Sequence, residues 1–145
     1  MNKRATHPTL ASRVAKALRD GAIMFVLALA IEMIGVFTQG WSYRVSDLVI
    51  LLTVTLQAIA ASFFLRFGSS GSATWRARIT NALGFGVGEL AILQIHNSAL
   101  QTMPDSLAPR FDLPLTLFLS AVCFLVALFA RPQANGLMPE DRQTG

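Results

Sequence analysis

The chain has 145 residues, of which 53% are hydrophobic and only 14% charged, and its mean hydropathy is +0.52. A water-soluble domain of this size needs a more polar surface, so the composition excludes an ordinary soluble fold and predicts a protein whose main partner is the lipid bilayer. The formal charge of +4 does not indicate nucleic acid, because the basic residues lie beside apolar segments rather than among aromatic residues.

Residues 1–20 form a basic leader. Its second half has apolar residues at helical spacing, which predicts either a short amphipathic helix lying on anionic lipid or a cytoplasmic extension of the first span. The apolar run that follows differs from a cleaved signal peptide, because Glu32 interrupts it and no A-x-A cleavage site follows before Trp41. We therefore expect a first helix that is retained.

Four apolar segments approach the roughly 20 residues that a helix needs to cross a bilayer core of about 30 Å. They are Gly21 to Phe37, Leu48 to Leu65, Ile79 to Ile95 and Leu113 to Ala130. The sequence thus predicts a transmembrane domain over residues 21–131. Residues 132–145 contain prolines and a charged cluster, and we expect a disordered cytoplasmic tail there.

Basic residues are distributed unevenly around these spans. Of the twelve Lys and Arg residues, five precede the first span, three lie between the second and third, and two follow the fourth, whereas Arg44 and Arg110 alone lie in the other two loops. This bias predicts that both termini and the middle loop are cytoplasmic, in a bacterial-type inner (plasma) membrane.

The predicted fold class is an all-α membrane protein with four transmembrane helices arranged as two hairpins. A Gly- and Ser-rich stretch at residues 68–72 is typical of a flexible linker and separates the hairpins. Residues 97–111, which contain Pro104 and Pro109, predict a longer outer loop between the third and fourth helices.

Glu32 and Glu89 carry the largest free-energy cost of insertion into a membrane, because each places a carboxyl group inside an apolar segment. Intramembrane carboxyl groups indicate a functional site by default. Arg19 precedes Glu32 by 13 positions and Arg78 precedes Glu89 by 11, which corresponds to about 20 and 16 Å of helix. We therefore expect both carboxyl groups near mid-membrane, at similar depths.

The third predicted helix is the least apolar of the four. Gly84 and Gly88 form a G-x-x-x-G spacing that predicts a helix-packing face, and His96 follows Glu89 by seven positions on nearly the same side of the helix. These two residues could converge with Glu32 of the first helix and with Gln57 and Thr53 of the second, at the interface of the first and third helices. Such a polar track is typical of proton or cation pathways, because a carboxyl group in a low-dielectric environment gains proton affinity.

Two functions from different classes fit these residues. One is a proton- or cation-coupled transporter or channel that uses Glu32 and Glu89, with Gln57 and His96 assisting. The other is an accessory or assembly subunit in which the glutamates and the glycine face hold helices together or bind another membrane protein. The partner is then a second copy of the chain or a larger membrane protein, and His96 is an interfacial side chain.

No catalytic, metal or cofactor motif is present in the sequence. Neither a Walker loop nor G-x-S-x-G nor H-E-x-x-H occurs, so the sequence favours a protein that is not an enzyme. Glu32, Glu89, His96 and Cys123 lack the spacing of a preformed metal site, and only His96 lies near the spans, so one chain cannot supply two histidines to a haem. We expect no cofactor and no metal.

Overall fold

The computed structural model describes residues 9–40, 42, 44–67, 74–103 and 108–130. These residues form four α-helices and no β-strand: α1 (Leu10–Gln39), α2 (Val45–Phe67), α3 (Trp75–Gln101) and α4 (Leu113–Phe129). The prediction of an all-α chain with four helices is confirmed for this part of the chain. The predicted linker at 68–72 and the predicted tail at 132–145 lie outside the described residues.

Polar side chains cap the start of three helices. Thr9, Thr74 and Asp112 each accept a hydrogen bond of 2.9–3.4 Å from the backbone N–H three residues further on, which satisfies a donor that the helix itself leaves free. Gly40 ends α1 with φ of 66°, a left-handed conformation that glycine adopts without steric cost. Between these ends α1 is continuous, so residues 10–20 are its first turns and not a separate helix.

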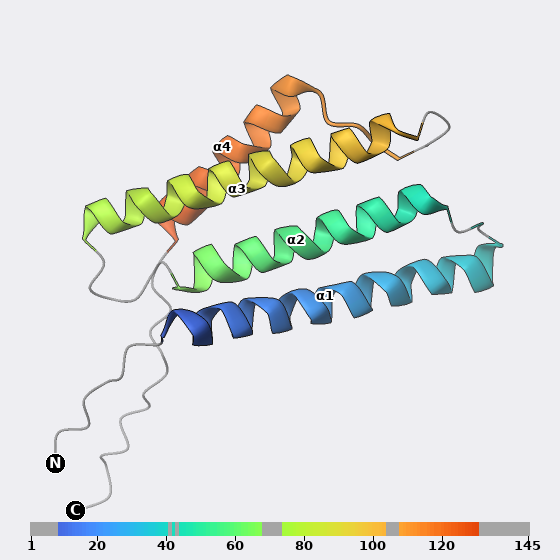
Figure 1. Ribbon diagram of the computed structural model, residues 1–145, viewed down its shortest axis with the longest axis horizontal. Helices are drawn as coiled ribbons and strands as arrows, with labels where there is room; N and C mark the ends of the chain where they lie inside the picture. Colours follow the sequence, from blue (N-terminus) through green and yellow to red (C-terminus); the bar gives the residue numbers. More distant parts are fainter. Residues whose placement is uncertain (1–8, 41, 43, 68–73, 104–107, 131–145) are drawn as a thin grey trace, which may run out of the picture.

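Helices that are adjacent in sequence are also adjacent in space. α1 packs against α2, α2 against α3, and α3 against α4. Figure 1 shows α2 between α1 and α3, with α4 crossing α3 obliquely. The helices therefore form an open row instead of a bundle closed around one axis. The sequence predicted an interface between the first and third helices, but α2 occupies that place.

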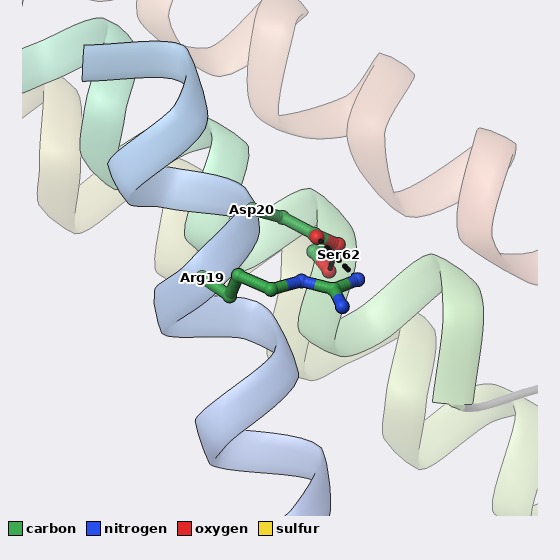
Figure 2. A network of polar contacts seen from close by, with 3 residues as sticks. All are labelled: Arg19, Asp20 and Ser62. Carbon is green, nitrogen blue, oxygen red and sulfur yellow. Dashed lines mark hydrogen bonds and ion pairs between the residues drawn. The ribbon is translucent and has the colours of Figure 1, made fainter. Parts of the chain in front are cut away.

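The contacts between α1 and α2 include a close apolar contact and a polar contact beside it. Gly21 lies directly against Ile59, whose side chain would overlap any Cβ at position 21. One residue earlier, the Asp20 carboxylate accepts a hydrogen bond of 2.6 Å from the Ser62 hydroxyl and lies 3.3 Å from the Arg19 guanidinium, as Figure 2 shows. These neighbouring contacts fix how α1 and α2 are aligned along their length.

Glycines on α3 allow close approach on both of its sides. On the α2 side, a Cβ at Gly84 would lie 2.6 Å from Cε1 of the Phe64 ring. On the α4 side, a Cβ at Gly86 would lie 3.1 Å from the backbone oxygen of Ser120. The buried core forms beside these glycines, where Phe64 stacks on Phe85 with ring centres 5.9 Å apart.

Most apolar surface of the row faces outward. α1 and α2 are each long and apolar enough to cross a membrane, and in each only 11% of the most apolar 18-residue window is buried. α4 is apolar as well but has only 17 residues. A core helix of a soluble protein would be mostly buried, so the exposure of α1 and α2 agrees better with contact to lipid.

Candidate functional site

Four polar side chains of α3 contact neighbouring elements along the length of the helix, and we call this set the α3 seam: Asn81, Glu89, His96 and Asn97. The first three are spaced by eight and seven residues, which returns them to nearly the same side of a helix with about 3.6 residues per turn. At the start of the seam, the Asn81 amide donates a hydrogen bond of 2.7 Å to the Phe64 carbonyl near the end of α2. The polar character of α3 is thus directed at protein neighbours.

Glu89 lies at the middle of the seam and is only 4% exposed. Its Oε1 accepts a hydrogen bond of 2.5 Å from Nε2 of Gln57 on α2, and Cys123 of α4 lies within electrostatic range of the carboxyl group. Among the described residues, no cation pairs with this carboxyl group. A carboxyl group that has a neutral amide donor and no counter-ion, in apolar surroundings, is equipped to bind a proton or a cation.

His96 lies two turns further along α3 and is 3% exposed. Its Nδ1 is 2.8 Å from the Thr53 hydroxyl of α2, and its Nε2 is 3.0 Å from the carbonyl oxygen of Pro109. The ring also packs against Phe111, with centroids 5.2 Å apart. His96 therefore joins three parts of the molecule, namely α2, α3 and the segment that leads into α4, and lies inside the protein instead of at an exposed interface.

Asn97 fastens the same segment to α3. Its amide donates a hydrogen bond of 2.6 Å to the Phe111 carbonyl and accepts one of 2.9 Å from the Phe111 N–H. Arg110 adds a hydrogen bond of 3.2 Å to the Leu100 carbonyl. Residues 109–111 are thus held to the end of α3 by contacts from both backbone and side chains.

Glu32 is not brought to this site. It is half-buried on α1, and in the part of the chain that the structure describes it makes no hydrogen bond or ion pair. The contacts of Asp20 with Ser62 and Gly21 with Ile59 align α1 and α2 so that Glu32 lies opposite residues 49–50 of α2. Counted along α2, that is about two turns, or roughly 11 Å, from Gln57, so Glu32 does not join the pair of Glu89 and Gln57.

The predicted packing glycines lie against α2. Gly84 and Gly88 both face the Phe64 ring, although a Cβ at Gly88 would be 3.8 Å from it, an ordinary van der Waals distance. The sequence reasoning missed Gly86, which approaches α4 most closely. The position of Gly86 between Gly84 and Gly88 could have indicated that a second helix approaches α3 there. It also missed the pairings of Asp20 and Asn97, which depend on helix alignment that no short motif encodes.

The described residues contain no group of three or more His, Cys, Asp or Glu side chains arranged to hold a metal ion. On α4, the Ser120 hydroxyl oxygen is buried, and no hydrogen-bond partner for it occurs in the same part of the chain. No protein-family model, curated protein or solved structure matches this chain. Its function must therefore be argued from the α3 seam itself.

Proposed function

We propose that this chain is a small multi-pass membrane protein in which Glu89 and Gln57 form the proton- or cation-binding centre of a transporter or channel. The observation that carries the proposal is the burial of the Glu89 carboxyl group against a neutral amide, with no cation beside it in the described structure. A carboxyl group in that environment exchanges between a neutral, proton-bound form and a charged form that attracts a cation.

Four transmembrane spans with both termini in the cytoplasm complete the proposal. The outward-facing apolar surfaces of α1 and α2 and the ten-to-two bias of basic residues support this arrangement. The antiparallel row places the start of α1, the end of α2 and the start of α3 at one end, where the exposed basic side chains of Lys16, Arg19 and Arg76 gather. A cytoplasmic leaflet rich in anionic lipid attracts such an end.

A second copy of the chain is part of the proposed assembly. An open row of four helices encloses no space by itself, whereas two rows placed face to face can surround a path. The carboxyl group of Glu89 is buried within one row beside Gln57 of α2, so the row supplies the binding group, which has to open toward the path when a proton or cation is exchanged.

Infrared difference spectroscopy of the purified chain in lipid tests the central claim. Between acidic and alkaline pH, we expect the band of a protonated carboxyl group that is present in the wild type and in Glu32→Gln but absent in Glu89→Gln. If Glu89→Gln retains every pH-dependent carboxyl band, then Glu89 does not exchange a proton and the proposal is wrong.

Proton flux into liposomes, driven by a potassium diffusion potential and followed with a pH-sensitive dye, tests transport separately. We expect Glu89→Gln to reduce the flux to that of empty liposomes. Equal flux in the wild type and in Glu89→Gln would contradict a role of the carboxyl group in proton movement, whatever the infrared result.

The accessory-subunit function is supported by a different observation. Glu32 has no polar partner in the described structure, and its neighbours Ile31 and Ile34 are 68% and 60% exposed. Within the described residues α1 packs mainly against α2, so a carboxyl group on its outer side is available to another membrane protein. Capture of a stoichiometric larger partner in mild detergent, lost in Glu32→Gln and kept in Glu89→Gln, would favour this function over transport.

A further inference from the structure

We propose that His96 is a reversible proton-binding latch that tightens the junction of α2, α3 and the segment leading into α4 when its ring is charged. The proposal rests on the donors and acceptors around the ring. It is independent of the function assigned to Glu89, because the contacts of His96 do not include that carboxyl group.

The partner of Nε2 is unambiguous. The carbonyl oxygen of Pro109, 3.0 Å away, can only accept a hydrogen bond. Nε2 must therefore carry a proton to be bonded in this geometry. The state of the ring then depends on Nδ1 alone.

The partner of Nδ1 has two roles. The Thr53 hydroxyl lies 2.8 Å from Nδ1 and also 2.8 Å from the Val49 carbonyl on its own helix. Its single hydrogen can point to only one of them. If it points to Val49, the hydroxyl oxygen can accept a hydrogen bond from a protonated Nδ1, so the ring carries protons on both nitrogens.

Only the charged ring satisfies all three contacts at once. With a proton on Nε2 alone, the Thr53 hydroxyl must turn to Nδ1 and gives up its bond to Val49. With a proton on Nδ1 alone, the lone pair of Nε2 faces the oxygen of Pro109 and that contact is lost. The charged ring also binds the Pro109 carbonyl more firmly, since a charged donor makes a hydrogen bond roughly twice as strong as a neutral one.

The charged and titratable groups on the surrounding elements leave His96 without a counter-ion in the described structure. Three nearby charged side chains are engaged elsewhere: Asp47 of α2 accepts a hydrogen bond from the Arg44 N–H, Asp112 caps α4, and Arg110 binds the Leu100 carbonyl. The two glutamates are farther from the ring, because Glu89 lies two turns away along α3 and Glu32 lies on α1, beyond α2. The charge of the ring is thus met by two oxygen dipoles instead of a carboxylate.

The latch acts on residues 109–111. Asn97 and Arg110 hold this segment by contacts that do not depend on protonation in the neutral range, whereas the Pro109 contact does. Gain of the proton on Nδ1 should therefore strengthen the hydrogen bond from Nε2 to Pro109 and tighten the entry to α4, and its loss should weaken that hydrogen bond without breaking it.

Nitrogen-15 NMR of the histidine ring in the full-length chain in lipid nanodiscs tests the latch. The substitution His7→Gln removes the other histidine, so one ring remains. We expect both ring nitrogens to be protonated at acidic pH and Nε2 alone at alkaline pH. Hydrogen–deuterium exchange of residues 108–112, corrected for the intrinsic pH dependence, should slow as the ring gains its proton.

Thr53→Val and Thr55→Val are matched variants. Thr55 makes the same hydroxyl contact to the carbonyl four residues earlier, at 2.8 Å, but it has no contact with His96. Loss of a hydrogen bond to a charged ring should move the midpoint of the titration about one pH unit toward acid in Thr53→Val, and Thr55→Val and Thr53→Ser should leave it unchanged.

Three results would overturn the latch. The first is a ring that stays neutral, in one tautomer, throughout the pH range in which the chain is folded. The second is an equal shift of the midpoint in Thr53→Val and Thr55→Val. The third is exchange of residues 108–112 that does not follow the titration of the ring.

Discussion

The interfaces on the two sides of α2 differ in chemistry. The α1–α2 interface has a close apolar contact between Gly21 and Ile59 and a polar contact near the same end, from Ser62 to Asp20. The α2–α3 interface carries polar contacts from end to end, through Asn81, Glu89 and His96. Glu32 and Glu89 are the same residue type in similar apolar sequences, but their helices differ in the number of neighbouring helices that cover them. α3 is covered on two sides, whereas α1 is covered on one.

The largest effect should come from filling the space at Gly86, because the α3–α4 crossing depends on it. A Cβ there would lie 3.1 Å from a backbone oxygen that cannot turn aside, so we expect Gly86→Leu to cost about 3 kcal/mol of unfolding free energy. Gly88→Ala is the control. It meets only an ordinary contact at 3.8 Å and should stabilise the helix by up to about 1 kcal/mol. Denaturant titration in detergent measures both, and equal losses would contradict the assigned crossing.

Removing the hydrogen-bond partner of Glu89 should cost more stability than removing the Glu32 carboxyl group itself. Gln57→Leu removes the donor to Glu89 and leaves a buried carboxyl group without a partner, which should cost about 2 kcal/mol. Glu32→Leu removes a carboxyl group that has no partner in the described structure and should be neutral or stabilising. The same titration compares them. A larger loss in Glu32→Leu than in Gln57→Leu would reverse the roles that we assign to the two sides of α2.

Asn97→Ala should loosen the entry to α4 with a smaller loss of stability, about 1.5 kcal/mol, because part of the backbone of Phe111 can then bind water. We expect faster hydrogen–deuterium exchange in residues 108–112 and unchanged exchange in α1. Ser98→Ala, an exposed neighbour on the same helix, serves as the control. Exchange that rises equally in both variants would show that the amide does not fasten this segment.

The smallest effect should come from Ser62→Ala, which removes the hydrogen bond from Ser62 to Asp20 between α1 and α2. The Asp20 carboxylate keeps Arg19 as a neighbour at 3.3 Å, so we expect a loss of about 1 kcal/mol or less. Cysteine crosslinking between the start of α1 and the end of α2 would report whether their alignment changes. A loss as large as that of Gly86→Leu would mean that α1 depends on this contact far more than its apolar packing implies.

The sequence predicted the helices well because apolar length is a local property. The cores of all four lie within the predicted segments, although α1 begins at Leu10 and α3 extends to Gln101. The site was predicted only in part. The seven-residue spacing placed Glu89 and His96 on one side of a helix, but the depth of Glu32 relative to Glu89 depends on how α1 slides along α2. That alignment is set by Gly21 and Asp20, and their partners lie about 40 residues further along the chain.

The 17 residues of α4 have a consequence for the lipid around the proposed four-span arrangement. At about 1.5 Å per residue the helix measures roughly 26 Å, shorter than a hydrocarbon core of about 30 Å, and its oblique course across α3 reduces its reach further (Figure 1). If α4 spans the membrane as proposed, the mismatch would be met by a thinner bilayer beside α4 or by flanking side chains that reach to the interface, at an energetic cost for each ångström. In that arrangement, membranes of different thickness would change the angle at which α4 crosses α3 beside Gly86.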